Sequence, residues 1–134
     1  MARPTNNQSL EDYLEAILVV QQRKGHCRSV DVADHLGFTK PSVSVAVSNL
    51  TRLGYVHKQA NGNLQLTNEG RAYAADVLDR HRLIGMVLTD LGVSPETADA
   101  DACKIEHDIS EETFRRIQEW YAARTLRETP EGVS

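Results

Sequence analysis

The chain has 134 residues, of which 40% are hydrophobic and 25% charged, as expected for one compact domain or two small ones that share a core. No apolar run approaches the ~20 residues of a membrane span, and Met1 to Gln8 lacks the apolar region of a signal peptide. With only Cys27 and Cys103 as thiols, a disulfide scaffold is excluded. These features predict a cytoplasmic protein with reduced thiols.

The charge is distributed unevenly along the chain. A net charge of -4 argues by itself against a nucleic-acid partner. No Asp or Glu occurs between His35 and Asn68, however, and Lys40, Arg52 and Lys58 lie inside that stretch. This segment is therefore a candidate for DNA contact, although three cations also fit a weakly charged polar surface.

Three helices are predicted in the first part of the chain. Ser9 can cap a helix that runs to about Lys24. A short helix starts at Ser29 and closes at Gly37, and a third begins within residues 39–42, where an early proline costs no hydrogen bond. Two short helices joined by a tight glycine turn predict a helix-turn-helix.

A β-hairpin is predicted directly after the third helix. Residues 55–58 and 63–66 form two short strands around Asn61-Gly62, a pair that tolerates the positive φ of tight turns. A hairpin in this place is typical of the wing of a winged helix.

The rest of the chain predicts helices alone. Thr67 caps a long helix that runs to about Leu91, a helix from Ser94-Pro95 reaches His107, and one from Ser110 reaches about Leu126 before a frayed end over 129–134. The predicted fold class is mostly α, with a winged helix-turn-helix DNA-binding domain over residues 1–66. An all-helical dimerisation and metal-binding domain follows over residues 67–134.

The helices after Gly70 carry more apolar side chains than two small halves can bury by themselves. We expect part of this surface to pair across a twofold axis. The residues concerned are Leu83, Ile84, Val87, Leu88, Phe114, Ile117, Trp120 and Tyr121.

The third predicted helix has an apolar face made of Val43, Val47 and Leu50, so its other residues face outward. Ser and Asn side chains can bond base edges or phosphates, Lys40 can meet a phosphate, and an exposed Val45 fits a thymine methyl. A helix whose small polar residues are merely solvated would show the same pattern. The candidate DNA-binding residues are Thr39, Lys40, Pro41, Ser42, Ser44, Val45, Ser48, Arg52 and Lys58.

Cys103, Glu106 and His107 have a spacing that places a thiol, a carboxylate and an imidazole on one face of a helix. Side chains from two other segments could close round the same ion: Asp12, Glu15 and His81. Taken separately, two acids early in a helix also suit its positive end, and a single histidine is more often a surface or core residue.

Together these segments resemble the family of metal-dependent repressors typified by the diphtheria toxin repressor and the manganese transport regulator. The resemblance runs from about Ser9 to Leu126. It rests on residues 9–15 (SLEDYLE), 31–33 (DVA), 66–70 (LTNEG), 80–83 (RHRL) and 102–107 (ACKIEH). It implies that the metal ligands are Asp12, Glu15, His81, Cys103, Glu106 and His107.

The resemblance further implies a metal-activated homodimeric repressor that binds double-stranded operator DNA and controls genes of manganese or iron homeostasis. The cofactor would be Mn(II) or Fe(II), with one or two ions per subunit. The ligand set is a hybrid, because Cys103 stands where the manganese branch has Glu and Asp12 where the iron branch has Met. The ancillary site of the iron branch looks degraded, because Gly85 and Asp99 stand at two of its positions.

Other classes of protein would share part of this pattern. A winged-helix regulator could be independent of metal, or could sense redox through Cys103. A zinc hydrolase would need an open coordination position and a cleft, and the sequence shows no lid, no Gly-rich loop and no nucleophile motif. We therefore expect no enzymatic activity, no small-molecule substrate and no membrane partner.

Overall fold

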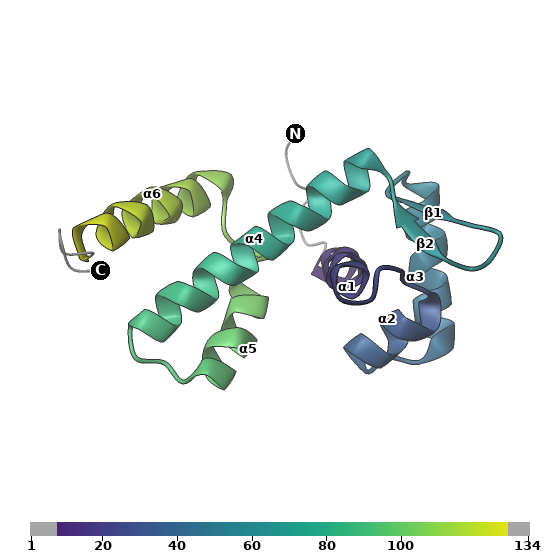
Figure 1. Cartoon of the computed structure of the whole chain (residues 1–134), viewed down its shortest axis with the longest axis horizontal. Helices are drawn as coiled ribbons and strands as arrows, with labels where there is room; N and C mark the ends of the chain where they lie inside the picture. The colour runs from purple at the N-terminus through teal and green to yellow at the C-terminus, as the bar shows by residue number, and fades with distance from the viewer. Residues whose placement is uncertain (1–7, 129–134) are drawn as a thin grey trace. The chain divides into compact units, whose positions relative to one another are not determined.

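The computed structural model describes residues 8–128 (Figure 1). The frayed end predicted at 129–134 lies outside the described residues. The chain divides into two compact units between Leu78 and Asp79. This division falls inside α4 (Asn68–Asp90), so the helix contributes to both units. The boundary at residue 66 stays a prediction.

The first unit is a winged helix-turn-helix, as predicted. It contains α1 (Gln8–Lys24), α2 (Ser29–Leu36), α3 (Lys40–Arg52), β1 (Val56–Lys58), β2 (Leu64–Leu66) and the start of α4. In the described residues α1 is already helical at Gln8, so the prediction that Ser9 caps this helix is wrong.

Local chemistry fixes the two helices of the motif. Gly37 ends α2 with a φ of 72°, and Thr39 caps α3 by accepting from the backbone N–H of Ser42 at 3.4 Å. Asp31 caps α2, because its carboxylate accepts from the Arg28 N–H at 2.9 Å and from Lys24 Nζ at 2.9 Å. Both hydrogen bonds hold the pKa of Asp31 below its ordinary value, and the bond from Lys24 has the larger effect.

The wing is an antiparallel hairpin in which Val56 pairs with Leu66 and Lys58 with Leu64. Its turn is longer than the tight Asn61-Gly62 turn that was predicted. The Gln59 N–H donates to the Asn63 carbonyl at 2.8 Å, and Gly62 supplies the positive φ of 89°. The hairpin follows α3 directly and packs against it.

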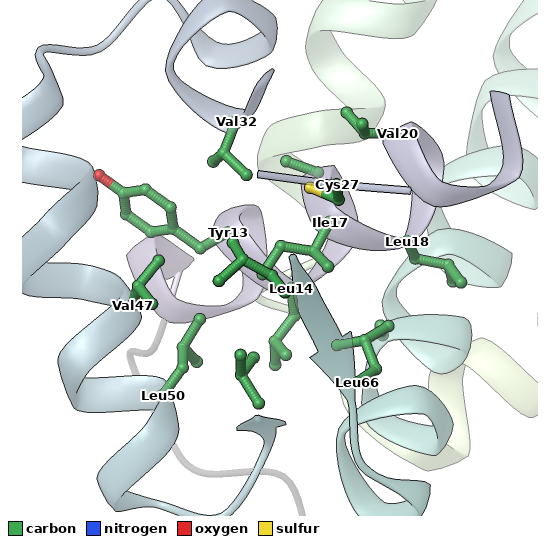
Figure 2. Packing of buried hydrophobic residues seen from close by; sticks show 14 of the residues in the cluster. Tyr13, Leu14, Ile17, Leu18, Val20, Cys27, Val32, Val47, Leu50 and Leu66 are labelled. Carbon is green, nitrogen blue, oxygen red and sulfur yellow. The ribbon is translucent and has the colours of Figure 1, made fainter. Parts of the chain in front are cut away.

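The core of the first unit lies between α1, α3 and the wing. Figure 2 shows Leu14 and Ile17 of α1 facing Leu50 of α3 and Leu66 of β2, all of them buried. Each such side chain contributes roughly 1.5–3 kcal/mol to folding. Cys27 lies in the same core, and burial raises its pKa to about 12. Its thiol therefore stays protonated and is a poor metal ligand.

The start of α4 is packed directly against the segment before β1. The Thr67 hydroxyl donates to the Gly54 carbonyl at 2.7 Å and accepts from the Gly70 N–H at 3.0 Å. A Cβ atom at position 70 would overlap the backbone carbonyl of Tyr55. This close approach explains why a glycine stands at the end of the 66–70 motif.

We expect Gly70→Ala to lower the free energy of unfolding by about 1–3 kcal/mol, because the methyl group meets backbone rather than a flexible side chain. Gly85→Ala is the matched control on the same helix. No atom lies within 4 Å of a Cβ at position 85, so this change should stabilise the protein by roughly 0.5–1 kcal/mol. Denaturant unfolding of both variants tests the prediction, and a shift of the same sign would contradict it.

The second unit contains the rest of α4, α5 (Pro95–Ile105) and α6 (Glu111–Glu128). Ser94 and Ser110 cap α5 and α6, as predicted. The structure corrects the end of α5, which stops at Ile105 and not at His107. No helix in the described part of the chain is both long and apolar enough to cross a membrane.

Arg80 organises this second unit. Its buried guanidinium donates to the Ile109 carbonyl at 2.8 Å, pairs with Glu111 at 2.5 Å and lies over the Phe114 ring at 4.8 Å from the centroid. The hydrogen bond from Arg80 lowers the pKa of Glu111. Arg80 thus holds the turn between α5 and α6 against α4.

Candidate metal centre and nucleic-acid surface

Four of the candidate metal ligands meet within the second unit. His81 extends from α4, Cys103 lies in the last turn of α5, and Glu106 and His107 follow it directly. Glu106 lies between two imidazoles, with His81 Nδ1 at 2.9 Å from Oε2 and His107 Nε2 at 3.3 Å from Oε1. Ligand atoms of Cys103, Glu106 and His107 lie within 4.8 Å of one another.

Cys103, Glu106 and His107 keep the relative positions expected of a helix although α5 is shorter than predicted. Glu106 keeps helical φ and ψ angles of −57° and −27°, and its N–H donates to the Ala102 carbonyl at 2.9 Å. The first residue after Ile105 therefore continues the helical path. This continuation lets the side chains at i, i+3 and i+4 converge.

The donors in this cluster suit a divalent transition metal. A thiol, a carboxylate and two imidazoles are the ligand types that such ions take in proteins. Because they come from α4 and from the end of α5, the packing of these helices assembles them.

Asp12 and Glu15 lie one turn apart on α1, in the first unit, and both are partly buried. Their neighbour Glu11 has a different environment. It is 2% exposed, and its carboxylate accepts a hydrogen bond of 2.6 Å from the Tyr73 hydroxyl on α4. Glu11 therefore fastens α1 to the start of α4 within the winged-helix unit, a role that its sequence position alone did not indicate.

The outer face of α3 is exposed as predicted. Val43, Val47 and Leu50 are buried, while Val45 is 64% exposed. All nine candidate DNA-binding residues are exposed: Thr39, Lys40, Pro41, Ser42, Ser44, Val45, Ser48, Arg52 and Lys58. Thr39 and Ser42 also form the cap of α3.

A groove of about 390 Å³ runs beside α3. Two cations, Arg52 and Lys58, line it together with the hydroxyls of Ser29, Ser44, Ser48 and Thr51. Cations and hydroxyls in one groove can bind a phosphate. Sequence reasoning missed Thr51, which helical spacing from Ser44 and Ser48 could have indicated, and Ser29, which only the packing of α2 brings there.

This architecture defines a class: a winged-helix regulator with a cluster of metal-type ligands in its helical unit. The family description "Iron dependent repressor, N-terminal DNA binding domain" matches residues 7–64. The description "Iron dependent repressor, metal binding and dimerisation domain" matches residues 67–132. The chain belongs to the iron-dependent repressor family.

The curated relatives are transcriptional regulators, and one of them is named for iron. An uncharacterised HTH-type transcriptional regulator of Methanocaldococcus jannaschii is 34% identical over 84% of this chain and 91% of its own length. The transcriptional regulator MntR of Escherichia coli is 36% identical over 78% and 68%. The iron-dependent repressor IdeR of Mycobacterium leprae is 35% identical over 80% of this chain, which spans only 47% of that relative.

Solved structures confirm the fold. The T. acidophilum IdeR structure is 29% identical with a TM-score of 0.75, over 90% of this chain and 55% of that chain. A manganese-dependent transcriptional repressor in complex with manganese is 27% identical with a TM-score of 0.75, over 82% and 51%. The matched domains and the curated relatives are transcriptional regulators, which confirms the prediction that the chain is not an enzyme.

Proposed function

We propose that this chain is a homodimeric repressor that Mn(II) or Fe(II) activates for binding to operator DNA, and that it controls genes of manganese or iron homeostasis. The observation that supports this most is the convergence of His81, Cys103, Glu106 and His107 in a chain whose other unit is a winged helix. Relatives named for manganese and for iron keep both metals in the proposal.

The bound metal would act as a cross-link of one or two ions per subunit. We assign Asp12 and Glu15 of α1 to it together with the four residues of the second unit, by their place in the family's motifs. Ligands drawn from both units would restrict the orientation of α3 and favour the DNA-binding state. In a dimer, that state would place the two α3 helices about one turn of DNA apart, ~34 Å.

Exposed apolar side chains of the second unit support the homodimer. Met86 is 46% exposed and Trp120 48%, and Leu91 and Leu126 exceed 70%. A second copy of this unit would cover such a surface. Three of the eight residues proposed from the sequence, Leu83, Ile84 and Phe114, are buried within the single chain. The proposed dimer surface therefore keeps the five that are exposed or partly exposed: Val87, Leu88, Ile117, Trp120 and Tyr121. Light scattering that finds a monomer at micromolar concentration would contradict the dimer.

Lys40 is expected to contact a DNA phosphate, because it is exposed in the first turn of α3. Lys40→Ala should weaken binding to every DNA sequence. It should also reduce the slope of the logarithm of the binding constant against the logarithm of salt concentration (the salt slope) by about one, since one fewer counterion is released. Arg71→Ala, which removes an exposed cation from α4, is the control and should leave the slope unchanged. Binding isotherms at several salt concentrations decide the matter, and an unchanged slope for Lys40→Ala would show that Lys40 contacts no phosphate.

A binding experiment tests the whole proposal. Duplexes would be selected from a random-sequence pool once with Mn(II) and once with a chelator, and the selected DNA titrated with Mn(II), Fe(II), Zn(II) or no metal. We expect tight binding only with metal. Equal affinity without metal would support the metal-independent alternative instead. A metal-free response to oxidant that is lost in Cys103→Ser would support the redox alternative.

A further inference from the structure

His81 is held between two carboxylates of the second unit. Its Nδ1 atom lies 2.9 Å from Glu106 Oε2, and its Nε2 atom lies 2.7 Å from Oδ1 of Asp99. Asp99 is on α5, four residues and about one turn before Cys103. The proposed metal ligands include Glu106 but not Asp99.

A neutral imidazole carries one N–H donor and one lone pair, and the group bound to the donor decides which nitrogen is which. When an ion is bound at Nδ1, the ring proton lies on Nε2, where the Asp99 carboxylate can accept it. The Nδ1 atom faces Glu106, another proposed ligand from this unit, so an ion between them would contact both. A carboxylate that orients a histidine in this way typically raises its strength as a metal ligand.

We propose that Asp99 is a positioning residue of the metal centre: it accepts the Nε2–H of His81 and holds Nδ1 toward Glu106. This proposal rests on the proposed function, because it requires that His81 and Glu106 bind an ion. It assigns a role to the very position at which the ancillary site looked degraded from the sequence.

The surroundings of Asp99 favour this role over direct metal binding. Its side chain is 76% exposed and opens onto a groove between α4 and α5. Among the described residues that line this groove, the other carboxylate is that of Asp90, which is bound to Tyr121 at 2.8 Å and Arg124 at 3.0 Å. One carboxylate and one imidazole nitrogen are too few to hold an ion alone.

The test measures metal affinity in the full-length protein. Mn(II) and Co(II) are titrated in competition with a chromophoric chelator for the parent, Asp99→Ala, Asp99→Glu and the control Glu96→Gln. Glu96 is an exposed acid in the first turn of the same helix. We expect Asp99→Ala to lower the affinity for both ions about 10–100-fold while the number of bound ions stays the same. Asp99→Glu should recover part of the lost affinity, and Glu96→Gln should bind both ions as the parent does.

A second measurement needs no metal. The unfolding temperature of metal-free Asp99→Ala should match that of the parent, because the exposed Asp99 side chain adds little to the stability of the fold.

Two results would overturn the positioning role alone. Asp99→Ala could bind both ions as the parent does, or it could bind one ion fewer, which would make Asp99 a ligand. A parent protein that binds no ion would instead remove the proposed function, and the positioning role with it.

Discussion

Asp12→Ala should abolish most of the effect of metal on DNA affinity while the protein stays folded. Asp12 lies on α1 of the winged-helix unit, whereas His81, Cys103, Glu106 and His107 lie in the other unit and can still hold an ion. Loss of Asp12 should therefore reduce the effect of metal on DNA affinity more than it reduces the affinity for metal. Couplings of this kind are typically about 5–150-fold, and we expect the variant to lose most of that factor.

The measurement is DNA affinity with and without Mn(II), accompanied by metal affinity in the absence of DNA. Glu69→Ala, which removes an exposed carboxylate from the first turn of α4, is the control and should keep the full metal response. An Asp12→Ala protein whose DNA affinity rises with metal as in the parent would refute the coupling role of this carboxylate.

Cys103→Glu should shift metal preference toward Mn(II). A carboxylate is a harder ligand than a thiolate, so the substitution favours manganese over zinc and cobalt. We expect the ratio of Mn(II) to Zn(II) affinity to rise roughly tenfold, which corresponds to about 1.4 kcal/mol. Competition titrations with both ions measure the ratio, and the loss of the thiolate-to-metal absorption of the Co(II) protein would report that the sulfur has left the site.

Cys27→Ala is the matched control, because Cys27 is the only other cysteine and its thiol is buried in the core of the first unit. That change should lower stability and leave the metal preference as it was. If Cys103→Glu and Cys27→Ala give the same ratio of affinities as the parent, Cys103 is not a ligand.

The winged helix could be predicted from sequence because short-range chemistry specifies it. Gly37 supplies the left-handed residue that ends α2, and Thr39, two residues further on, starts α3 together with Pro41. The end of α5 was misplaced because no glycine or proline marks it. The chain leaves the helix at Ile105, where the Asp108 N–H donates to the Ile105 carbonyl at 3.0 Å in a tighter turn.

Pairings between distant segments could not be predicted. The contact between His81 and Asp99 joins residues 18 apart, and that between Arg80 and Glu111 joins residues 31 apart. Both depend on how α4 packs against later helices, which a single sequence does not encode in any local pattern. Cys103, Glu106 and His107 were found because they lie within five consecutive residues at helical spacing, which a local pattern reveals even though α5 itself ends at Ile105.

The central claim is that metal and DNA bind to one protein with a shared free energy of coupling. Thermodynamic linkage requires this coupling to act in both directions. The direct test is therefore a Mn(II) titration of the parent protein with and without a saturating amount of the selected duplex. We predict that DNA raises the affinity for Mn(II) by the same factor by which Mn(II) raises the affinity for DNA; an affinity for Mn(II) that is the same with and without DNA would contradict the claim.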